Sequence, residues 1–542
     1  MPGVPMTRRE AREAAKAGER AAGRGSTGTA IPDAAIPPVP TVAMSFDELA
    51  GAGLPTAPQQ GPQIPPAPPS AAQKAAKAGT GGLAALIAKH PNAWLFSALG
   101  VVFVLLGTGA VFAGTALAPA SASSVVTAPS PTATTPPPRP TPAAPAAATR
   151  LRTCSIAGLA SDPRLGTFEG SVLNAATGEA LFDRAAGTGA ATASVMKTLV
   201  AATALKDLGP DYQFSTKVYA GSEPGSVVLV GGGDPTLSAG GNSVYKGAPQ
   251  LGDLAAQVIG ARGADEPPIT TIILDSTMWN NSDSWDPSWP ANERTLGYQP
   301  LIVPLMVDGD RANPAAQTSP RSTDPVGAAG KAFAAALGVS GADISSGSAI
   351  TSNKLLGEVK SQPVKTLIGQ MLPNSDNTLA EMLARVSSKA SGADGSAASL
   401  TGVITKALNG YGVTASGLVI KDGSGESKNN SVPPLVVAQL MVKVAAGANG
   451  LDVIYNALPV SGKTGTLASR FSGPNAVARG AVNAKTGSIA NVYTLGGIVH
   501  AADGTALAFA FYAFGNVKST AMAAIDTVVT GVFKCGDNLS NN

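Results

Sequence analysis

The C-terminal part of the chain contains, at residues 478–514, the stretch ARGAVNAKTGSIANVYTLGGIVHAADGTALAFAFYAF. Its three runs of β-branched, aromatic and small apolar residues predict strands, and we place turns at Lys-Thr-Gly-Ser and Ala-Asp-Gly between them. An apolar helix is predicted next, at residues 521–533. Strands joined by short turns pair antiparallel, so the stretch predicts an antiparallel sheet with a helix beside it and a mixed α/β fold class.

The tripeptide Lys-Thr-Gly occurs twice, at Lys463 and at Lys485. Lys485 lies among the predicted strands. A cation at a strand edge, followed closely by glycine, lets a substrate approach the backbone. Lys463 lies between Pro459 and Arg470, with two nearby glycines and no regular strand before it. We therefore expect Lys485 to be chemically active and Lys463 to lie in a turn.

A second motif, Ser194-Val195-Met196-Lys197, opens a helix predicted at 191–209. Residues three apart share a helix face, so the amine of Lys197 can reach the hydroxyl of Ser194 and, when neutral, take its proton. The helix N-terminus adds backbone N–H donors and the positive end of the dipole, which suit an oxyanion.

Other nucleophiles fit less well. Ser243 and Lys246 have the same spacing, but Gly247 and Pro249 follow closely and are incompatible with a sustained helix. His500, beyond the predicted membrane segment, is at a strand end next to a turn, a position typical of a surface imidazole. The sequence lacks a Cys/His cluster of the kind that binds zinc, so no metal is predicted.

A lysine base of this kind is expected with a Ser-x-Asn, whose hydroxyl relays a proton and whose amide fixes a substrate carbonyl. Ser427 begins one such triplet in a polar loop, and Ser540 begins another at the chain end. Ser375 and Asn377 instead lead directly into a predicted helix. We favour this third pair.

Residues 210–355 are rich in glycine and in short strand-like runs such as VVLVGGG and TTIILDS. The helical patterns on both sides differ from them. We therefore predict one domain formed by 151–209 and 356–542, with 210–355 as one or more inserted subdomains.

Between residues 91 and 138 there is no charged side chain, and 93–117 is long and apolar enough to cross a bilayer. A cleavable signal peptide fits poorly, because some ninety residues precede the stretch. Residues 118–150 are rich in Pro, Ala and Thr and predict a semi-rigid stalk, whereas 1–92 predict a disordered tail.

Lys and Arg residues precede the predicted membrane helix, and the next cation after it is Arg139. The chain is therefore expected in the cell membrane as a single-pass protein, with a cytoplasmic N-terminus and an extracytoplasmic globular part. On that oxidising side, Cys154 and Cys535 are expected to form a disulfide; two buried free thiols are the alternative. The net charge of +3 is spread thinly, which argues against binding of nucleic acid.

With Ser-x-x-Lys, Ser-Asp-Asn and Lys-Thr-Gly in this order, the chain resembles the penicillin-binding proteins, and most closely the low-molecular-mass class C D-alanyl-D-alanine carboxypeptidase/endopeptidases. The likeness covers about 151–537. Its further marks are GGGDPTLS (231–238), ILDSTMW (273–279), YQPLIVPL (298–305), KDGSGES (421–427) and LPVSGKTGTLASRF (458–471).

The resemblance implies the steps of acylation. Ser194 would be acylated and Lys197 would be its general base. Ser375 and Asn377 would relay protons and hold the acyl amide.

It also implies how substrate is held. Lys485 and Thr486 would bind the terminal carboxylate, with Gly487 letting the substrate approach the strand. The backbone N–H groups of Ser194 and Ser488 would form the oxyanion hole.

The family fold is an antiparallel sheet flanked by helices with a helical subdomain, here with an inserted β-rich region. The resemblance implies a membrane-anchored serine DD-peptidase that trims peptidoglycan stem peptides, is inhibited by β-lactams and needs no cofactor. It specifies no oligomeric state. An inactive scaffold that binds the cell wall, or a β-lactamase, are the alternatives.

This sequence departs from the family at Glu426, where members tend to have an apolar residue. The change affects the pocket for the stem-peptide side chain. For the acidic residue that some members use there, Asp283 and Asp286 are the candidates, with loop packing as the alternative role.

Overall fold

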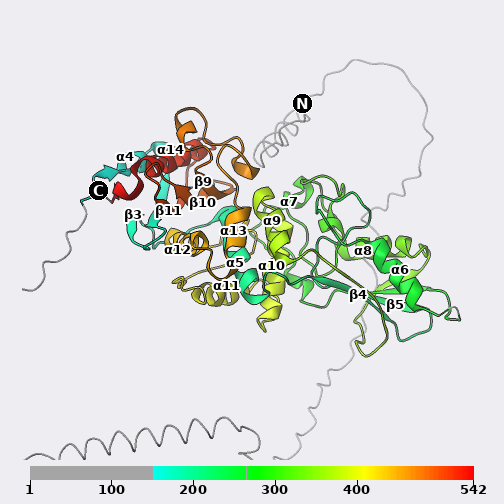
Figure 1. Cartoon of the computed structure of the whole chain (residues 1–542). Coiled ribbons are helices and arrows are strands. Elements are labelled where there is room, and N and C mark those ends of the chain that lie inside the picture. The colour runs from blue at the N-terminus through cyan, green and yellow to red at the C-terminus, as the bar shows by residue number, and fades with distance from the viewer. Residues whose placement is uncertain (1–150, 264, 542) are drawn as a thin grey trace, which may run out of the picture. The chain divides into compact units, whose positions relative to one another are not determined.

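The computed structural model describes residues 151–263 and 265–541 (Figure 1). The expected tail, membrane helix and stalk, at 1–92, 93–117 and 118–150, lie outside the described residues. Among the residues that are described, no helix is both long and apolar enough to cross a bilayer.

The C-terminal strands form an antiparallel sheet of β9 (Val482–Ile489), β10 (Val492–His500) and β11 (Ala506–Phe514), in the order β11-β10-β9. β2 (Thr167–Asn174) and β3 (Ala180–Arg184) form a second antiparallel pair, and β2 lies beside β11. The three strands predicted in the C-terminal stretch are confirmed.

One detail of that prediction is wrong. Lys-Thr-Gly-Ser is not the turn but lies inside β9, which pairs with β10 as far as Ile489. The reversal is made by Ala490 and Asn491, and Asn491 has a φ of 59°, the left-handed conformation that Asn tolerates better than most residues.

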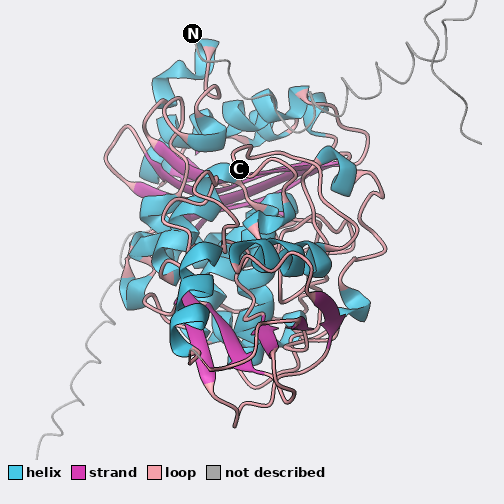
Figure 2. Ribbon diagram, turned by 90° about the vertical axis from the view of Figure 1, so that its right-hand side faces the viewer, coloured by secondary structure: helices cyan, strands magenta, loops and turns pink. Residues whose placement is uncertain are grey.

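Helices cover both faces of this sheet (Figure 2). α14 (Thr520–Cys535) packs on the face that carries Phe509 and Phe511, together with the short α4 (Ala157–Ala160). α12 (Pro434–Ala445) packs on the opposite face, which carries Ala510 and Tyr512. Alternate residues of β11 therefore enter two separate apolar cores, as the period of a strand requires.

The helical part is built around α5 (Met196–Asp207), whose residues from Met196 to Leu205 are all buried. The helix is therefore buried on every side and not along a single apolar face. The helices packed against α5 or against one another are α9 (Val364–Asn374), α10 (Asn377–Ala390), α11 (Leu400–Asn409) and α13 (Asp452–Ala457).

Between α5 and α9 the chain forms a five-stranded sheet in the order β7-β6-β5-β4-β8. Its strands are β4 (Ser215–Ala220), β5 (Ser226–Val230), β6 (Thr271–Asp275), β7 (Asp343–Ser346) and β8 (Leu355–Lys360). α6 (Leu251–Ala261) and α8 (Pro325–Ala336) share an apolar core with it, and α7 (Glu293–Leu296) lies in the segment between them. We call residues 210–360 the insert, because β8 continues past the expected boundary at 355.

Single turns of 3-10 helix occur throughout the described residues, at Pro163–Leu165, Ala193–Val195, Asn281–Asp283, Asp308–Asp310, Ala448–Gly450, Gly465–Leu467, Gly473–Ala478 and Gly536–Asn538.

The two ends of the described domain are tied together. A disulfide joins Cys154 to Cys535 across a sequence separation of 381, with the Cα atoms 5.4 Å apart. Beside it, β1 (Cys154–Ser155) pairs in parallel with β12 (Leu539–Ser540). The predicted bridge is confirmed.

Replacing both cysteines by serine is expected to lower the free energy of unfolding by about 2–4 kcal/mol, because the bridge restricts the unfolded chain. Urea denaturation of the oxidised protein and of the variant measures the difference. Adding a reductant should bring the wild type to the midpoint of the variant and leave the variant unchanged. Equal midpoints without reductant would contradict the prediction.

Candidate active site

Ser194 and Lys197 meet at the N-terminus of α5. Ser194 lies in the 3-10 turn Ala193–Val195 that leads directly into the helix, and Lys197 lies in its first turn. The Nζ atom of Lys197 is 2.9 Å from the Oγ atom of Ser194. Ser194 is 5% exposed and Lys197 is fully buried. The spacing seen in the sequence therefore becomes a contact between a nucleophile and an amine away from bulk water.

Two further oxygens surround the amine of Lys197. Its Nζ atom is 2.8 Å from the Oδ1 atom of Asn377 and 2.6 Å from the backbone oxygen of Ser424. A charged ammonium can only donate hydrogen bonds. In its neutral form the amine can donate to the amide and the carbonyl and keep its lone pair for the hydroxyl proton of Ser194. The arrangement therefore suits a general base.

Ser375 faces the site from the break between α9 and α10. It has a φ of 55°, and its Oγ atom is 3.0 Å from the Nζ atom of Lys485. Lys485, on β9, is also fully buried, and its Nζ atom lies 2.8 Å from the backbone oxygen of Thr486. The structure thus brings together the predicted pair Ser375 and Asn377 with the second Lys-Thr-Gly.

β9 is the edge strand of its sheet and passes very close to the turn that carries Ser194. A Cβ atom at Gly487 would lie 2.8 Å from the backbone oxygen of Thr192 and 2.1 Å from the Oγ1 atom of Thr494. The hydroxyl of Thr494 already donates to that Thr192 oxygen, at 2.7 Å. Only glycine permits this approach, which brings Ser488 and Ser194 to facing segments.

The loop 421–427 supplies the Ser424 carbonyl, and a side chain of α10 holds this loop in place. The carboxylate of Glu381 accepts hydrogen bonds from the backbone N–H groups of Gly423 (3.0 Å) and Ser424 (2.7 Å). Burial, and then the neighbouring Asp422, raise the pKa of Glu381 well above its usual range. Sequence reasoning missed the role of Ser424, because a backbone carbonyl leaves no side-chain signal.

The first Lys-Thr-Gly is not separate from the site. Lys463 is exposed in a turn, as predicted. Thr466, three residues later, contacts Thr486 with 2.7 Å between their Oγ1 atoms. Sequence reasoning missed Thr466, although its position in the Gly-Thr-Leu part of the family mark is a signal that could have identified it.

The competing sequence motifs make other contacts and do not supply a nucleophile or base to the site. Lys246 is exposed and Ser243 lies outside any helix. The Oγ atom of Ser427 is 2.6 Å from that of Ser288, and His500 is exposed with its Nε2 atom 2.7 Å from the hydroxyl of Tyr455. Within the described ranges, no group of three or more His, Cys, Asp and Glu side chains is arranged to hold a metal ion.

Asp283 and Asp286, the candidates for recognising the stem-peptide side chain, make different contacts. Asp283 forms an ion pair with Arg385 on α10, at 2.8 Å. Asp286 accepts from the hydroxyl of Ser288 at 2.6 Å, and Ser288 in turn contacts Ser427. Asp286 is therefore linked to the loop 421–427, where the unusual Glu426 is buried.

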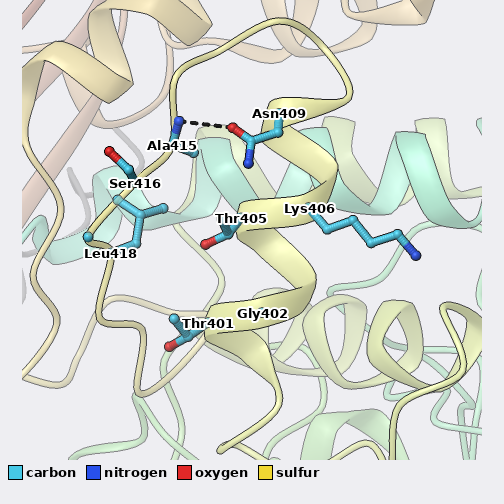
Figure 3. A pocket seen from close by; sticks show the side chains of 9 residues that line it. Thr401, Gly402, Thr405, Lys406, Asn409, Ala415, Ser416 and Leu418 are labelled. Carbon is cyan, nitrogen blue, oxygen red and sulfur yellow. Dashed lines mark hydrogen bonds between the residues drawn. The ribbon is translucent and has the colours of Figure 1, made fainter.

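A surface groove of about 680 Å³ lies between α11 and the segment 415–418 (Figure 3). Its walls carry hydroxyl and amide groups from Thr401, Thr405, Asn409 and Ser416, whereas the amine of Lys406 points away from the segment 415–418. None of its lining residues belongs to the three motifs. The groove is thus distinct from the Ser194 site, which is a narrow, nearly buried cluster.

Comparison with known proteins agrees with this geometry. The model of the D-Ala-D-Ala carboxypeptidase 3 (S13) family matches residues 153–320 and 312–532. Carboxypeptidase DacB of Mycolicibacterium smegmatis is 34% identical over 402 residues, which cover 72% of this chain and 86% of that protein. The D-alanyl-D-alanine carboxypeptidase of Actinomadura sp. is 29% identical over 471 residues, covering 71% and 84%.

Two crystal structures of penicillin binding protein 4 (dacB) from Haemophilus influenzae share the fold. One has a TM-score of 0.57 at 20% identity and covers 68% of this chain and 96% of its own. The other, a complex with a β-lactam, has a TM-score of 0.52 at 20% identity and covers 70% and 99%. The mixed α/β penicillin-binding-like fold expected from the sequence is confirmed.

If Thr486 binds the substrate's terminal carboxylate, Thr466→Val should weaken binding of a carboxylate-bearing substrate by about 2- to 10-fold. This is the effect of losing one hydrogen bond that orients the Thr486 hydroxyl. Steady-state kinetics with a peptide ending in D-alanyl-D-alanine measures the change.

Thr464→Val is the matched control, because the hydroxyl of Thr464 accepts from the backbone N–H of Val460 within the same turn. It should leave substrate binding unchanged. Equal losses in both variants would show that the shape of the turn, and not the Thr466 hydroxyl, is what matters.

Proposed function

The chain belongs to the D-Ala-D-Ala carboxypeptidase 3 (S13) family and is a serine-type D-Ala-D-Ala carboxypeptidase; from this premise we propose that it works through an acyl-enzyme on Ser194. Lys197 takes the hydroxyl proton as the Ser194 oxygen attacks the carbonyl carbon of the penultimate D-Ala. The observation that carries the proposal is the buried contact of 2.9 Å between these two side chains, with two oxygens accepting from the amine.

The oxyanion that forms would be bound by the backbone N–H groups of Ser194 and Ser488, which lie on facing segments. When the bond to the terminal D-Ala breaks, its amine must gain a proton. Lys197 holds the proton taken from Ser194, and Ser375 can pass it on. Water then attacks the acyl-enzyme with Lys197 again as base, and Ser194 is released.

Lys485 would stabilise the carboxylate of the terminal D-Ala from β9. The Thr486 hydroxyl, which donates to Thr466 in this structure, would turn to donate to that carboxylate and would accept from Thr466 instead. Gly487 keeps the strand close enough to the Ser194 turn for one ligand to span both. Asn377 holds Lys197 on one side and is available to the acyl amide on the other. These roles require a peptide with a free terminal carboxylate, which is the form of a peptidoglycan stem peptide.

Endopeptidase activity is also part of the proposal. In a peptide cross-link the leaving amine belongs to a second stem peptide, and a carboxylate of that peptide would take the place of the terminal D-Ala carboxylate. β-Lactams carry a strained amide and a carboxylate in the same spatial relation as the scissile amide and the terminal carboxylate of the peptide. The β-lactam complex of the Haemophilus influenzae protein supports inhibition by this class of compound.

Intact-mass analysis after incubation with benzylpenicillin tests the acyl-enzyme. The wild type and Lys463→Ala should each carry one stable adduct, and Ser194→Ala should carry none. Lys463 is the matched control, because it has the same Lys-Thr-Gly sequence as Lys485 but is exposed in a turn.

The alternatives predict different masses. An inactive scaffold that binds the cell wall would give no adduct on folded wild type and leave penicillin intact. A β-lactamase would give a transient adduct and rapid loss of penicillin. The first result would overturn the proposed acyl-enzyme, and the second would overturn inhibition by β-lactams.

We also propose that residues 93–117 anchor the enzyme in the cell membrane, with the N-terminus in the cytoplasm. The full-length chain should then sediment with membranes and be released by detergent but not by high salt. Deleting 93–117 should release it, whereas deleting the Pro- and Ala-rich segment 31–70 should not. Recovery of the full-length chain in the soluble fraction would refute the anchor.

A further inference from the structure

The insert touches the active site through two loops. Trp289 of the insert donates from Nε1 to the Oδ2 atom of Asp422 at 2.8 Å, next to the loop whose Ser424 carbonyl binds Lys197. Arg311 of the insert forms an ion pair with Asp376, the middle residue of Ser-Asp-Asn, at 2.7 Å between Nη2 and Oδ2. The insert therefore contacts both segments that place proton-transferring groups.

The contact with Asp376 is buried on both sides. The side chains of Arg311 and Asp376 are 1% and 2% exposed. The hydroxyl of Tyr245 lies 2.8 Å from Nη1 of Arg311 and 3.3 Å from Oδ2 of Asp376. Gln317 adds a hydrogen bond to Oδ2 at 3.0 Å. Three insert residues thus converge on one carboxylate.

Asp376 lies where α9 ends and α10 begins. Its Oδ1 atom accepts from the N–H of Leu379 at 2.9 Å and so caps α10. Its backbone N–H donates to the oxygen of Met371 at 3.0 Å, and Ser375, just before it, is the left-handed C-cap residue of α9 at a φ of 55°. For a residue other than glycine this conformation costs about 1 kcal/mol or more and persists only where its surroundings enforce it.

We propose that Arg311 is a positioning residue for the reaction, because its ion pair with Asp376 holds the Ser375 hydroxyl against Lys485. The inference rests on the proposed acylation of Ser194 and extends it: the insert is a working part of the proton relay. Tyr245 and Gln317 support the same carboxylate, so the insert holds Ser375 through a small network of contacts.

The pH at which Asp376 becomes protonated is a readout that a loss of stability alone would not change. Arg311, Arg321 and Tyr245 are the titratable groups that face this carboxyl. Burial alone raises the pKa of Asp376, but the charges of Arg311 and Arg321 and the Leu379 N–H hold it below its usual range. Asp376 therefore stays ionised as the pH falls, until the pH passes its lowered pKa.

Without Arg311 the buried carboxylate loses its partner, and its pKa should rise. Protonation of Asp376 would then weaken the hold on Ser375 at a higher pH than in the wild type. The acid limb of the acylation rate should accordingly move toward neutral pH in Arg311→Met. A role in folding alone would lower the melting temperature and leave this limb unmoved.

The experiment measures acylation of the full-length chain by benzylpenicillin in stopped flow, at several pH values and below the melting temperature of each variant. For Arg311→Met we expect the first-order acylation constant to fall by up to about 100-fold, the effect of misplacing a reacting group by about 1 Å. The dissociation constant of the non-covalent complex should change little. Arg311→Lys should recover part of the rate.

Milder variants guard against a failure to fold. Tyr245→Phe removes one hydroxyl that touches both Arg311 and Asp376, and Gln317→Leu removes a hydrogen bond near the surface. Each should slow acylation less than Arg311→Met, and in the same pH-dependent manner.

Asp211→Asn is the matched control, because Asp211 is an insert residue paired at 2.7 Å with Lys365 on α9, the helix whose C-cap is Ser375, but this ion pair is exposed. It should leave the acylation constant and its pH dependence at the wild-type values. The double variant Arg311→Met/Asp376→Asn removes both charges and should recover stability without recovering the rate.

The proposal is overturned if the folded Arg311 and Tyr245 variants acylate at the wild-type rate, or if the double variant regains it. A wild type that forms no acyl-enzyme is a separate outcome, because it would refute the proposed function before the role of Arg311 is reached.

Discussion

The buried amine of Lys197 is the constraint on which the rest of the site depends. It needs hydrogen-bond partners on several sides, and each partner comes from a different part of the chain: the turn before α5, α10 and the loop 421–427. The partner on α10 is 180 positions away and the one on the loop is 227. An amine cannot be taken out of water without such partners, so the motifs must converge for the domain to fold at all. The Nζ atom of Lys197 therefore serves both the reaction and the stability of the fold.

The turn that carries Ser194 shows how tightly this convergence is packed. A Cβ atom at Gly425 would lie 1.9 Å from the backbone oxygen of Ala193, and one at Gly487 would lie 2.9 Å from the Ala193 side chain. Two glycines, from the loop 421–427 and from β9, therefore enclose the turn. Ala193 itself has a φ of 45°, a conformation that L-residues other than glycine rarely adopt. The nucleophile is held by contacts on both sides, and its backbone N–H group has a fixed direction.

The sequence was informative where function depends on side chains in a fixed order. Spacing and the neighbouring residues in the chain identify Ser194, Lys197, Ser375 and Lys485, and the structure brings these four together. Placing Lys-Thr-Gly-Ser at a turn was wrong, because glycine usually marks a reversal, whereas Gly487 serves a close approach inside a strand. The Ser424 carbonyl and the Arg311 ion pair could not be predicted, since neither spacing nor composition encodes contacts between distant loops.

The position of the insert explains how a large excursion can leave the site intact. Its first and last strands, β4 and β8, pair antiparallel, with Ser215 opposite Lys360, so the chain leaves and re-enters the helical part at neighbouring points. The entropy of closing a loop grows only slowly with its length, and the arrangement of α5 and α9 does not depend on what lies between the paired strands. Closure alone would make the insert a passive addition. The buried ion pair between Arg311 and Asp376 fixes the position of the insert. An unpaired carboxylate at Asp376 would lower stability, so the insert must dock in one orientation whenever Ser375 is in place.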